Sequence, residues 1–333
     1  MSWKRFVNDR YMILFNKKTG LEMLSGINGH KDPFVTDLPT LLDIGIMGSC
    51  HNACSFCYQG HIKQPNMRLK DFKRIIDQVK HHVTQVALGG RGDPNKHENF
   101  KEIVEYCVKN EVVPSYTTSG INLTEDEIEV SKICGAVAVS DYEWTETYRA
   151  LTNLINAGVK TNIHQIFSKK TFQKCIDIIT GVNPWEHCSN CYRAPFPVKE
   201  LNAVIFLLFK PQGAGKRLDL IPKDYHLQHF ADVVFTPKAP FKIGMDSCLV
   251  NHVTKYVTPT DLQAMSIDTC EGARMSAYIT PDMKMMPCSF GNKIMWGCDI
   301  RKNSIQDVWT NHMSFKLFRS SLKKERNNCP YGL

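Results

Sequence analysis

Hydrophobic and polar positions along the chain follow two periods from about residue 40 onward. Short apolar runs such as residues 40–48 and 202–209 indicate buried strands. Between these runs, apolar side chains recur at three- and four-residue spacing, which indicates helices with one buried face. The first such face carries Leu69, Phe72, Ile75, Ile76 and Val79. The alternation predicts a parallel sheet covered by helices.

The pattern contains six strand–helix units, with strands predicted at residues 40–48, 83–90, 111–120, 135–140, 160–168 and 202–209. Because a closed barrel of this kind needs eight units, a doubly wound sheet and an incomplete barrel both fit. Cysteines or polar motifs follow the first four strands, and barrel enzymes gather their chemistry at the C-terminal ends of strands. We therefore expect an α/β fold, a partial (β/α)6 TIM-like barrel.

The two ends of the chain depart from this pattern. Residues 11–26 read as strand, turn and strand. Beyond residue 240, residues 276–290 predict a hairpin that turns at Pro281-Asp282, and residues 304–322 predict a last helix. We expect an N-terminal β-hairpin extension at 1–39, the barrel at 40–239 and a small hairpin-and-helix domain at 240–333.

Composition narrows the class of protein. The 333 residues are 43% hydrophobic, enough for a large core, and no apolar run is long enough to span a bilayer. The N-terminus lacks the pattern of a signal peptide, so we expect a cytoplasmic protein. The excess of basic over acidic residues is 41 − 33 = 8. This excess suits an anionic substrate but is too diffuse to predict a nucleic-acid surface.

The 13 cysteines are many for a reducing compartment, which favours metal binding by those that cluster. In the stretch GSCHNACSFCYQG, Cys50, Cys54 and Cys57 fall within eight residues. A structural zinc site needs four ligands, so a distant cysteine or His51 would have to complete it. Three cysteines on a four-iron cluster would instead leave one iron open for substrate chemistry.

The spacing Cys-x3-Cys-x2-Cys, with Phe56 before the last cysteine, resembles the signature of the radical S-adenosylmethionine (SAM) superfamily. The resemblance implies a [4Fe-4S] cluster held by Cys50, Cys54 and Cys57, whose open iron binds the amino and carboxylate groups of SAM. Reductive cleavage of SAM then releases a 5′-deoxyadenosyl radical, which abstracts hydrogen from a substrate. It also implies a reducing electron donor such as flavodoxin or ferredoxin.

Four further positions follow from the resemblance. The stretch LGGRGDPNKHENF resembles the family's glycine-rich SAM motif and implies SAM contacts from Gly89, Gly90 and Asp93. It departs from the common Gly-Gly-Glu form, because Arg91-Gly92 precede Asp93. Ser140 matches the position that meets the ribose, although a serine there could equally cap the next helix.

Three more candidates come from a helix and a strand. Arg149 could bind the SAM carboxylate through a bidentate contact, or it could be an exposed helix arginine. Asn162 and His164 share one side of a predicted strand and could contact cofactor or substrate. A histidine at such a position can also be a hydrogen-bonded core residue.

A second set of cysteines lies near the C-terminus. The stretch CEGARMSAYITPDMKMMPCSF resembles the start of SPASM and twitch domains, which carry auxiliary iron–sulfur clusters. It departs from them in having Met283 at the glycine position, and the later Cys-x2-Cys is missing. The resemblance implies one auxiliary cluster, and a structural zinc site is the alternative. The implied ligands are Cys270, Cys288 and Cys329, with Cys298 or Cys248 as the fourth.

Two other motifs stay without a role. Cys188 and Cys191 form HCSNC, which could bind a metal, donate a hydrogen atom or do neither. The stretch KPQGAGKR resembles a phosphate loop only superficially, since its spacing is wrong and no Ser or Thr follows Lys216.

The resemblance predicts the type of reaction and leaves the substrate open. The auxiliary domain favours hydrogen abstraction from a peptide or protein side chain, as in a maturase. The alternative is radical oxidation or rearrangement of a small molecule such as a sugar or nucleoside. A zinc-stabilised binding protein without catalysis is a third hypothesis. We expect neither a membrane nor a nucleic acid as partner.

Overall fold

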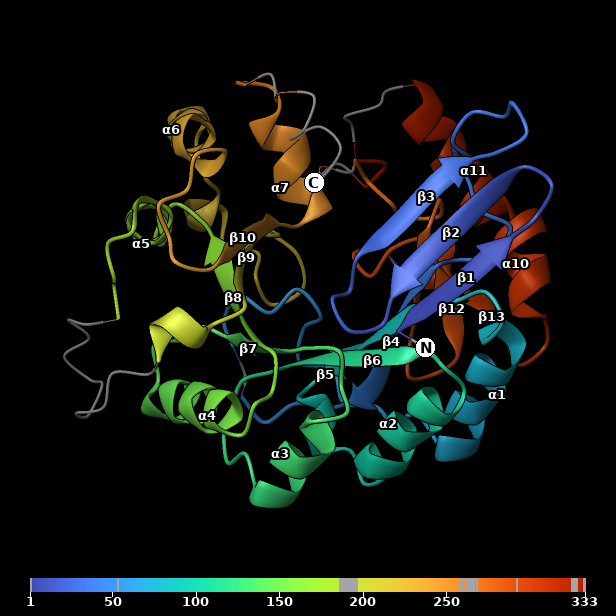
Figure 1. The fold of residues 1–333 in the computed structure, drawn as a ribbon, viewed down its shortest axis with the longest axis horizontal. Coiled ribbons are helices and arrows are strands. Elements are labelled where there is room, and N and C mark those ends of the chain that lie inside the picture. The colour runs from blue at the N-terminus through green and yellow to red at the C-terminus, as the bar shows by residue number, and fades with distance from the viewer. Residues whose placement is uncertain are drawn as a thin grey trace.

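A ten-stranded, mostly parallel sheet forms the centre of the computed structural model (Figure 1). The structure describes residues 2–52, 54–185, 197–257, 260, 267, 269–291, 293–324 and 329–331. The strand order is β10-β9-β8-β7-β6-β5-β4-β11-β12-β13, and within these residues the two outer strands do not pair with each other. The sheet is therefore open, as an incomplete barrel requires.

The six predicted barrel strands are all present and lie side by side in chain order. They are β4 (Leu41–Gly48), β5 (Gln85–Arg91), β6 (Val113–Thr118), β7 (Val137–Ser140), β8 (Thr161–Phe167) and β9 (Ala203–Leu208). Neighbouring strands in this set run parallel. The helices are α1 (Leu69–Val79), α2 (Phe100–Lys109), α3 (Glu125–Ser131), α4 (Thr145–Asn156), α5 (Phe172–Thr180) and α6 (Asp224–Val234). These elements confirm the partial barrel.

Short 3-10 helices lie in three of the connections. They are η1 (Pro94–Lys96), η2 (Val198–Glu200) and η3 (Leu218–Leu220). The first follows β5 directly, and the third follows the loop after β9.

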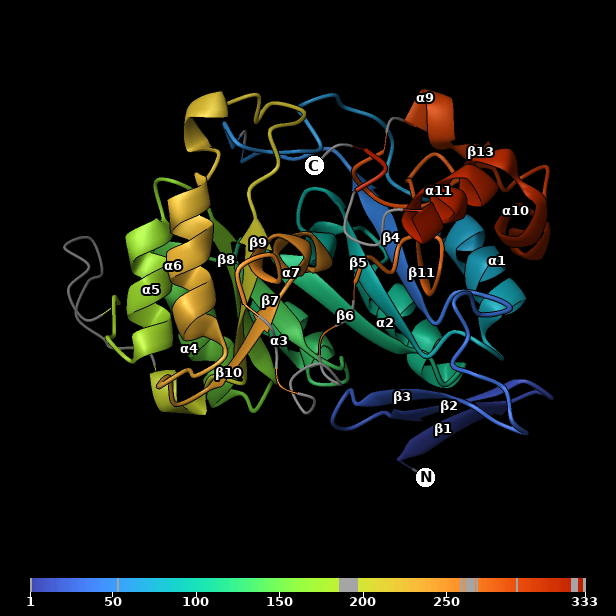
Figure 2. The ribbon, with the colours of Figure 1, turned by 90° about the horizontal axis from the view of Figure 1, so that it is seen from above.

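Side chains alternate between the two faces of each strand. In β4, Leu42 and Ile44 are fully buried and share one hydrophobic core with Phe72 of α1. Asp43 points to the opposite face, which is the interior of the barrel because the helices cover the outer face (Figure 2). The same alternation along β5 to β9 lines the interior with one set of side chains and packs the other set against the helices.

The C-terminal part of the chain adds strands at both ends of the barrel sheet. β10 (Lys242–Met245) runs parallel to β9, and β11 (Ser276–Ile279) runs parallel to β4. The predicted hairpin is β11 and β12 (Lys284–Met286), and β13 (Cys298–Asp299) pairs with β12. Two short helices, α7 (Ser247–Val253) and α9 (Lys293–Trp296), flank these strands in the chain.

The predicted last helix is divided in two. α10 (Ile305–Asn311) ends at His312, whose extended backbone (φ −66°, ψ 136°) breaks the helical path before α11 (Met313–Lys324) begins. Trp309 of α10 is buried, and its indole N–H donates to the Thr36 carbonyl at 2.8 Å.

The N-terminal extension is a separate three-stranded antiparallel sheet, one strand more than predicted. It consists of β1 (Trp3–Val7), β2 (Tyr11–Asn16) and β3 (Glu22–Gly26). The Tyr11 hydroxyl lies 3.2 Å from Nε2 of buried His82, which attaches this sheet to the barrel.

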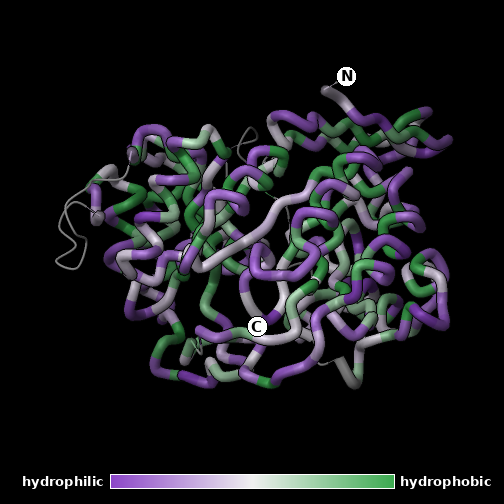
Figure 3. The backbone as a smooth tube through the Cα atoms, turned by 90° about the horizontal axis from the view of Figure 1, so that it is seen from below, coloured by the Kyte–Doolittle hydropathy of each residue, from purple (hydrophilic) through white to green (hydrophobic). Residues whose placement is uncertain are grey.

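Hydrophobic and hydrophilic residues are interleaved along strands and helices alike (Figure 3). None of the helices in the described residues combines the length and apolar character that crossing a bilayer demands.

Candidate functional site

The loop after β4 carries three half-buried cysteines, Cys50, Cys54 and Cys57. The loop turns back on itself, because the Cys57 backbone N–H donates to the Cys54 carbonyl at 3.1 Å. Burial raises the pKa of the Cys54 thiol, and the thiolates of Cys50 and Cys57 raise it further. The fold therefore brings the three predicted ligands into one another's electrostatic field. A bound metal centre would stabilise all three as thiolates.

Tyr142, two residues beyond the end of β7, lies beside Cys54 and opposes the rise in the pKa of that thiol. Burial raises the pKa of Tyr142, and Ser140 opposes that rise. The Tyr142 ring also packs against Phe56, with centroids 5.6 Å apart. Ser140 was predicted to lie at this site, whereas Tyr142 was not. The only feature of the sequence that points to Tyr142 is that an aromatic residue stands two positions beyond a predicted strand end.

The loop after β9 packs on the cysteine loop. The Ala214 backbone N–H donates to the Cys57 carbonyl at 2.9 Å. Gly213 has φ +61°, and a Cβ there would lie 2.4 Å from the Tyr58 carbonyl oxygen. A Cβ on Gly215 would lie 2.7 Å from the Phe56 carbonyl oxygen. Gly213, Ala214 and Gly215 therefore position the cysteine loop, a role that the sequence did not indicate.

The glycines of β5 allow close backbone packing beneath the same loop. Gly90 has φ +114°, and a Cβ there would lie 2.4 Å from the Met47 carbonyl oxygen. Gly92 has φ +118°, and a Cβ would lie 2.4 Å from the Ser49 carbonyl oxygen. A Cβ on Gly89 would meet no atom nearer than Asp43 Oδ1 at 3.7 Å, because it points into the barrel.

Three residues predicted to contact SAM are Asp93 and Asn162, which form hydrogen bonds within the protein, and Arg149, which is exposed. The Asp93 carboxylate accepts the backbone N–H of Ser119 at 2.9 Å and also accepts its hydroxyl, and burial raises the pKa of Asp93. The Asn162 amide oxygen accepts the Asn202 amide N–H at 2.6 Å. Arg149 is exposed on α4.

Two titratable side chains line the barrel interior. His164 of β8 lies 3.4 Å from the Thr117 hydroxyl, and burial lowers its pKa to about 4, so it is neutral at pH 7. Asp43 of β4 stands in register with Tyr278 of β11. Burial raises the pKa of Asp43 to about 7. Asp43 was not among the predicted site residues, although an acid inside the apolar run LLDIG is a signal.

Asp43 should make stability depend on pH. The unfolded carboxyl ionises near pH 3.9, whereas the folded one holds its proton up to pH about 7. Its contribution to stability is therefore complete below about pH 4 and is lost as pH rises through about 7. Asp43→Asn cannot ionise, so at about pH 8 we expect it to be more stable than the parent by about 2 kcal/mol, allowing for solvent screening.

Urea unfolding at about pH 5 and about pH 8 measures this difference, which should grow with pH. Asp232→Asn, an exposed substitution on α6, should show no such trend. An Asp43→Asn difference that does not change with pH would contradict the assignment.

The second cysteine group lies where α7, the β11–β12 hairpin and the C-terminal segment meet. It contains Cys248, Cys270, Cys288 and Cys329. Burial raises the pKa of the Cys288 thiol, and the other three thiolates raise it further. Burial also raises the pKa of Cys248 to about 12 and that of Cys270 to about 11. The structure thus groups four thiols from four separate segments.

Cys298 lies apart from this group. It is buried in β13 opposite Met285, its charged neighbours are Lys284, Asp299 and Asp307, and its sulfur accepts the Asn303 amide N–H at 3.5 Å. Of the two candidates for a fourth auxiliary ligand, the structure therefore places Cys248 beside the other three cysteines. Cys188 and Cys191 lie outside the described residues.

The spacing of the sulfurs bears on which metal they could hold. In the part of the chain that the structure describes, no three His, Cys, Asp or Glu side chains are close enough to hold a single metal ion. A zinc ion needs its thiolates about 2.3 Å from the metal. A four-iron cluster is several ångströms across, so its ligands stand further apart. Among the described residues, neither cysteine group is arranged as the ligand set of one metal ion.

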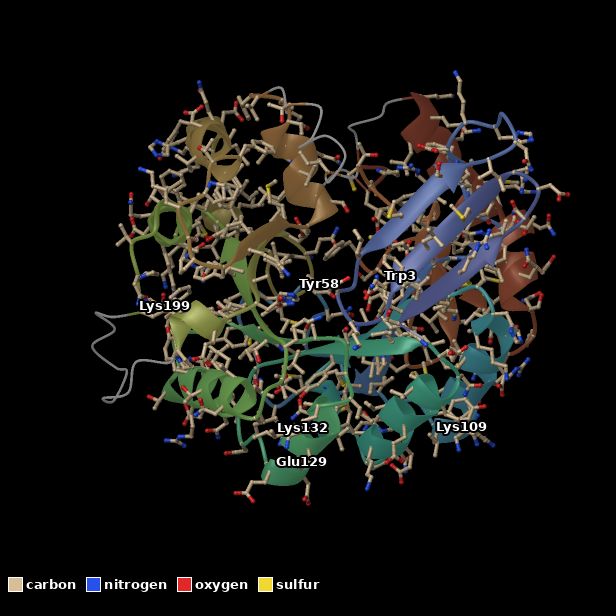
Figure 4. The ribbon with its side chains drawn as sticks, viewed as in Figure 1. Trp3, Tyr58, Lys109, Glu129, Lys132 and Lys199 are labelled. Atoms are coloured by element: carbon tan, nitrogen blue, oxygen red, sulfur yellow. The ribbon has the colours of Figure 1, made fainter. Side chains whose placement is uncertain are left out.

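Tyr58 connects the two groups. It follows Cys57 directly, lies near the centre of the molecule in Figure 4, and its ring packs on Phe290 with centroids 4.6 Å apart. Burial raises the pKa of the Tyr58 hydroxyl, and Ser289, the residue after Cys288, opposes that rise. The two cysteine groups therefore face the same central region of the barrel.

Comparisons of the sequence place this site in a known family. The model of the Radical SAM superfamily matches residues 44–180. Mycofactocin maturase MftC of Mycolicibacterium smegmatis is 22% identical over 307 residues, which cover 85% of this chain and 73% of the relative. PqqA peptide cyclase of Methylocella silvestris is 23% identical over 269 residues, which cover 74% of this chain and 67% of the relative.

Solved structures share the fold. Streptococcus suis SuiB bound to S-adenosylmethionine superposes with a TM-score of 0.74 at 13% identity, covering 96% of this chain and 89% of that one. Native anSMEcpe with bound AdoMet and the Kp18Cys peptide superposes with a TM-score of 0.59 at 14% identity, covering 84% and 82%.

The matched region contains the cysteine loop, the β5 glycines and Ser140. The radical SAM family uses a [4Fe-4S] cluster and SAM, and three thiols on one loop after the first barrel strand fit a cluster that keeps one iron open. The family model, the shared open barrel and this cysteine loop agree. Residues 44–180 therefore form a radical SAM domain, and the protein is a radical SAM enzyme.

Proposed function

We propose that this enzyme modifies a side chain of a peptide or protein, as a maturase does. The observation that carries the proposal is a pair of cysteine groups facing one open barrel, in a chain similar to enzymes named as maturase and peptide cyclase. SuiB has also been solved with its precursor peptide SuiA, and that structure superposes with a TM-score of 0.70. An open sheet leaves a side through which a chain-like substrate can enter.

The cysteines divide into two ligand sets. Cys50, Cys54 and Cys57 would hold the cluster that binds SAM. The second set would hold one auxiliary iron–sulfur cluster and consists of Cys248, Cys270, Cys288 and Cys329. When bound, the first cluster and SAM supply a 5′-deoxyadenosyl radical that takes hydrogen from the substrate. A reduced flavodoxin or ferredoxin would provide the electron.

Other residues of the chain position these groups. Tyr142 orients the Cys54 sulfur, and the loop after β9 fixes the Cys57 carbonyl. Gly89, Gly90 and Ser140 are the SAM contacts that we retain, since they lie beside the cysteine loop or face the interior. Asp93 is hydrogen-bonded to Ser119, and Asn162 is hydrogen-bonded to Asn202. We therefore propose that Asp93 and Asn162 hold strand ends in position.

Anaerobic reconstitution followed by incubation with deuterated precursor peptides tests the proposal. We expect about eight irons per chain, deuterium transfer into 5′-deoxyadenosine and a peptide of altered mass. Transfer from a sugar or nucleoside but from no peptide would overturn the peptide assignment. A colourless, zinc-bound protein would overturn the radical assignment as well.

The glycine at position 213 should be needed for the first cluster. Gly213→Ala places a Cβ 2.4 Å from the Tyr58 carbonyl oxygen at φ +61° and must displace the segment after Cys57. We expect about four fewer irons per chain after reconstitution. Gly158→Ala is the matched control, because its φ of +76° gives the same backbone strain with no atom within 4 Å. Full iron content in the Gly213 variant would contradict this role.

A further inference from the structure

A buried lysine lies between two segments that carry cysteines of the second group. Lys210 follows β9 and is 6% exposed. Its ammonium group forms an ion pair with Asp246 and lies 4.7 Å from the centroid of the Phe290 ring. Asp246 is the N-cap of α7, which carries Cys248, and Phe290 stands two residues after Cys288. Lys210 is therefore held against both segments at once.

The charge on Lys210 is maintained inside the protein. Burial opposes it, but the Asp246 carboxylate outweighs burial and raises the pKa of Lys210. The carboxylate also accepts the backbone N–H groups of Leu249 at 2.8 Å and Leu208 at 3.2 Å. The ammonium is thus one of three donors to this carboxylate.

Holding the two segments together would not by itself require a buried ion pair at this position. Charged side chains are costly to bury, and a hydrophobic pair of the same size would often hold the segments as well. A cation close to thiolates acts instead on whatever centre those thiolates hold. Cluster potentials respond to net charge, hydrogen bonds and solvent exposure, and a charge acts more strongly where water is excluded.

We propose that Lys210 and Asp246 together set the reduction potential of the auxiliary cluster, an inference that rests on the cluster assigned to the second cysteine group above. The Lys210 ammonium stabilises the reduced, more negative form and raises the potential. The Asp246 carboxylate lowers it by partly neutralising the ammonium. The balance between the two determines how readily an electron reaches this position from a substrate.

The test measures the auxiliary cluster by itself. In the full chain carrying Cys50→Ala, Cys54→Ala and Cys57→Ala, reconstitution should leave about four irons, all at the second site. Potentiometric titration followed by electron paramagnetic resonance then gives the midpoint potential. In this background we expect Lys210→Met to lower the ratio of reduced to oxidised cluster, measured at a fixed potential, by at least about tenfold. For a one-electron couple this corresponds to a midpoint potential lower by about 59 mV. Asp246→Asn should raise it by a similar factor while keeping a good N-cap.

Two lysine variants provide the controls. Lys216→Met removes an exposed lysine from the same loop and should leave the potential unchanged. Lys210→Arg keeps the positive charge and should restore the potential of the parent. An unchanged potential in Lys210→Met overturns the proposal. If Lys210→Met binds no iron, an unchanged potential in Asp246→Asn overturns the proposal instead. A triple-cysteine background without iron overturns the auxiliary cluster itself, and the two failures are thereby distinguished.

Discussion

Replacing Cys54 by alanine is expected to abolish the formation of 5′-deoxyadenosine from SAM. Cys54 is the central member of the first cysteine group, where it lies beside Tyr142 and within electrostatic range of Cys50 and Cys57. Removing one of three ligands leaves two thiolates, too few to hold a cluster that keeps one iron open for SAM. Dithionite-reduced protein incubated with SAM and analysed by chromatography should give no more product than a blank without enzyme.

The matched control is Cys134→Ala. This half-buried cysteine follows α3 and packs against the hydrophobic core, and its thiol donates to the Val130 carbonyl of the preceding turn at 3.9 Å. The variant loses one thiol, as Cys54→Ala does, and should retain product formation. Undiminished 5′-deoxyadenosine from Cys54→Ala would show that the SAM-binding cluster lies elsewhere.

Much of the barrel could be predicted from the sequence because its signals are local. Each barrel strand is an apolar run bounded by turns, and each helix repeats apolar positions over several turns. β1 and β10 were missed because each is short and neither contains a buried residue, so no apolar run marks them. The break at His312 was missed because α10 and α11 keep the same apolar spacing across it.

The candidate site also contains residues that the sequence could predict and residues that only the fold reveals. Cys50, Cys54 and Cys57 could be identified because all three ligands lie on one loop. Tyr142, Gly213 and Lys210 each contact a segment that is distant in the chain, by more than 80 residues for Tyr142 and Gly213. No local sequence pattern encodes such contacts. Cys248 and Cys298 could not be separated from the sequence either, since chain spacing does not reveal which segment folds back onto Cys270.

Cys248→Ala and Cys298→Ala should separate the two candidates by experiment. In Cys248→Ala, one of four grouped thiols is lost, and we expect about four fewer irons per chain while the first cluster stays intact. Formation of 5′-deoxyadenosine should then continue, whereas peptide modification should fall to background. In Cys298→Ala, only a core sulfur that accepts the Asn303 amide is lost. Its cost should be about 1 kcal/mol of unfolding free energy, with full iron content.

Iron analysis and Mössbauer spectra of the two reconstituted variants give the decision. Loss of the auxiliary cluster in Cys298→Ala but not in Cys248→Ala would require β13 to leave its pairing with β12, because Cys298 is buried opposite Met285 and lies apart from the other thiols. Loss in both would mean that the hairpin and the cluster stabilise each other. Only loss confined to Cys248→Ala agrees with the four-cysteine group, in which α7 contributes a ligand from the end of the barrel sheet opposite the hairpin.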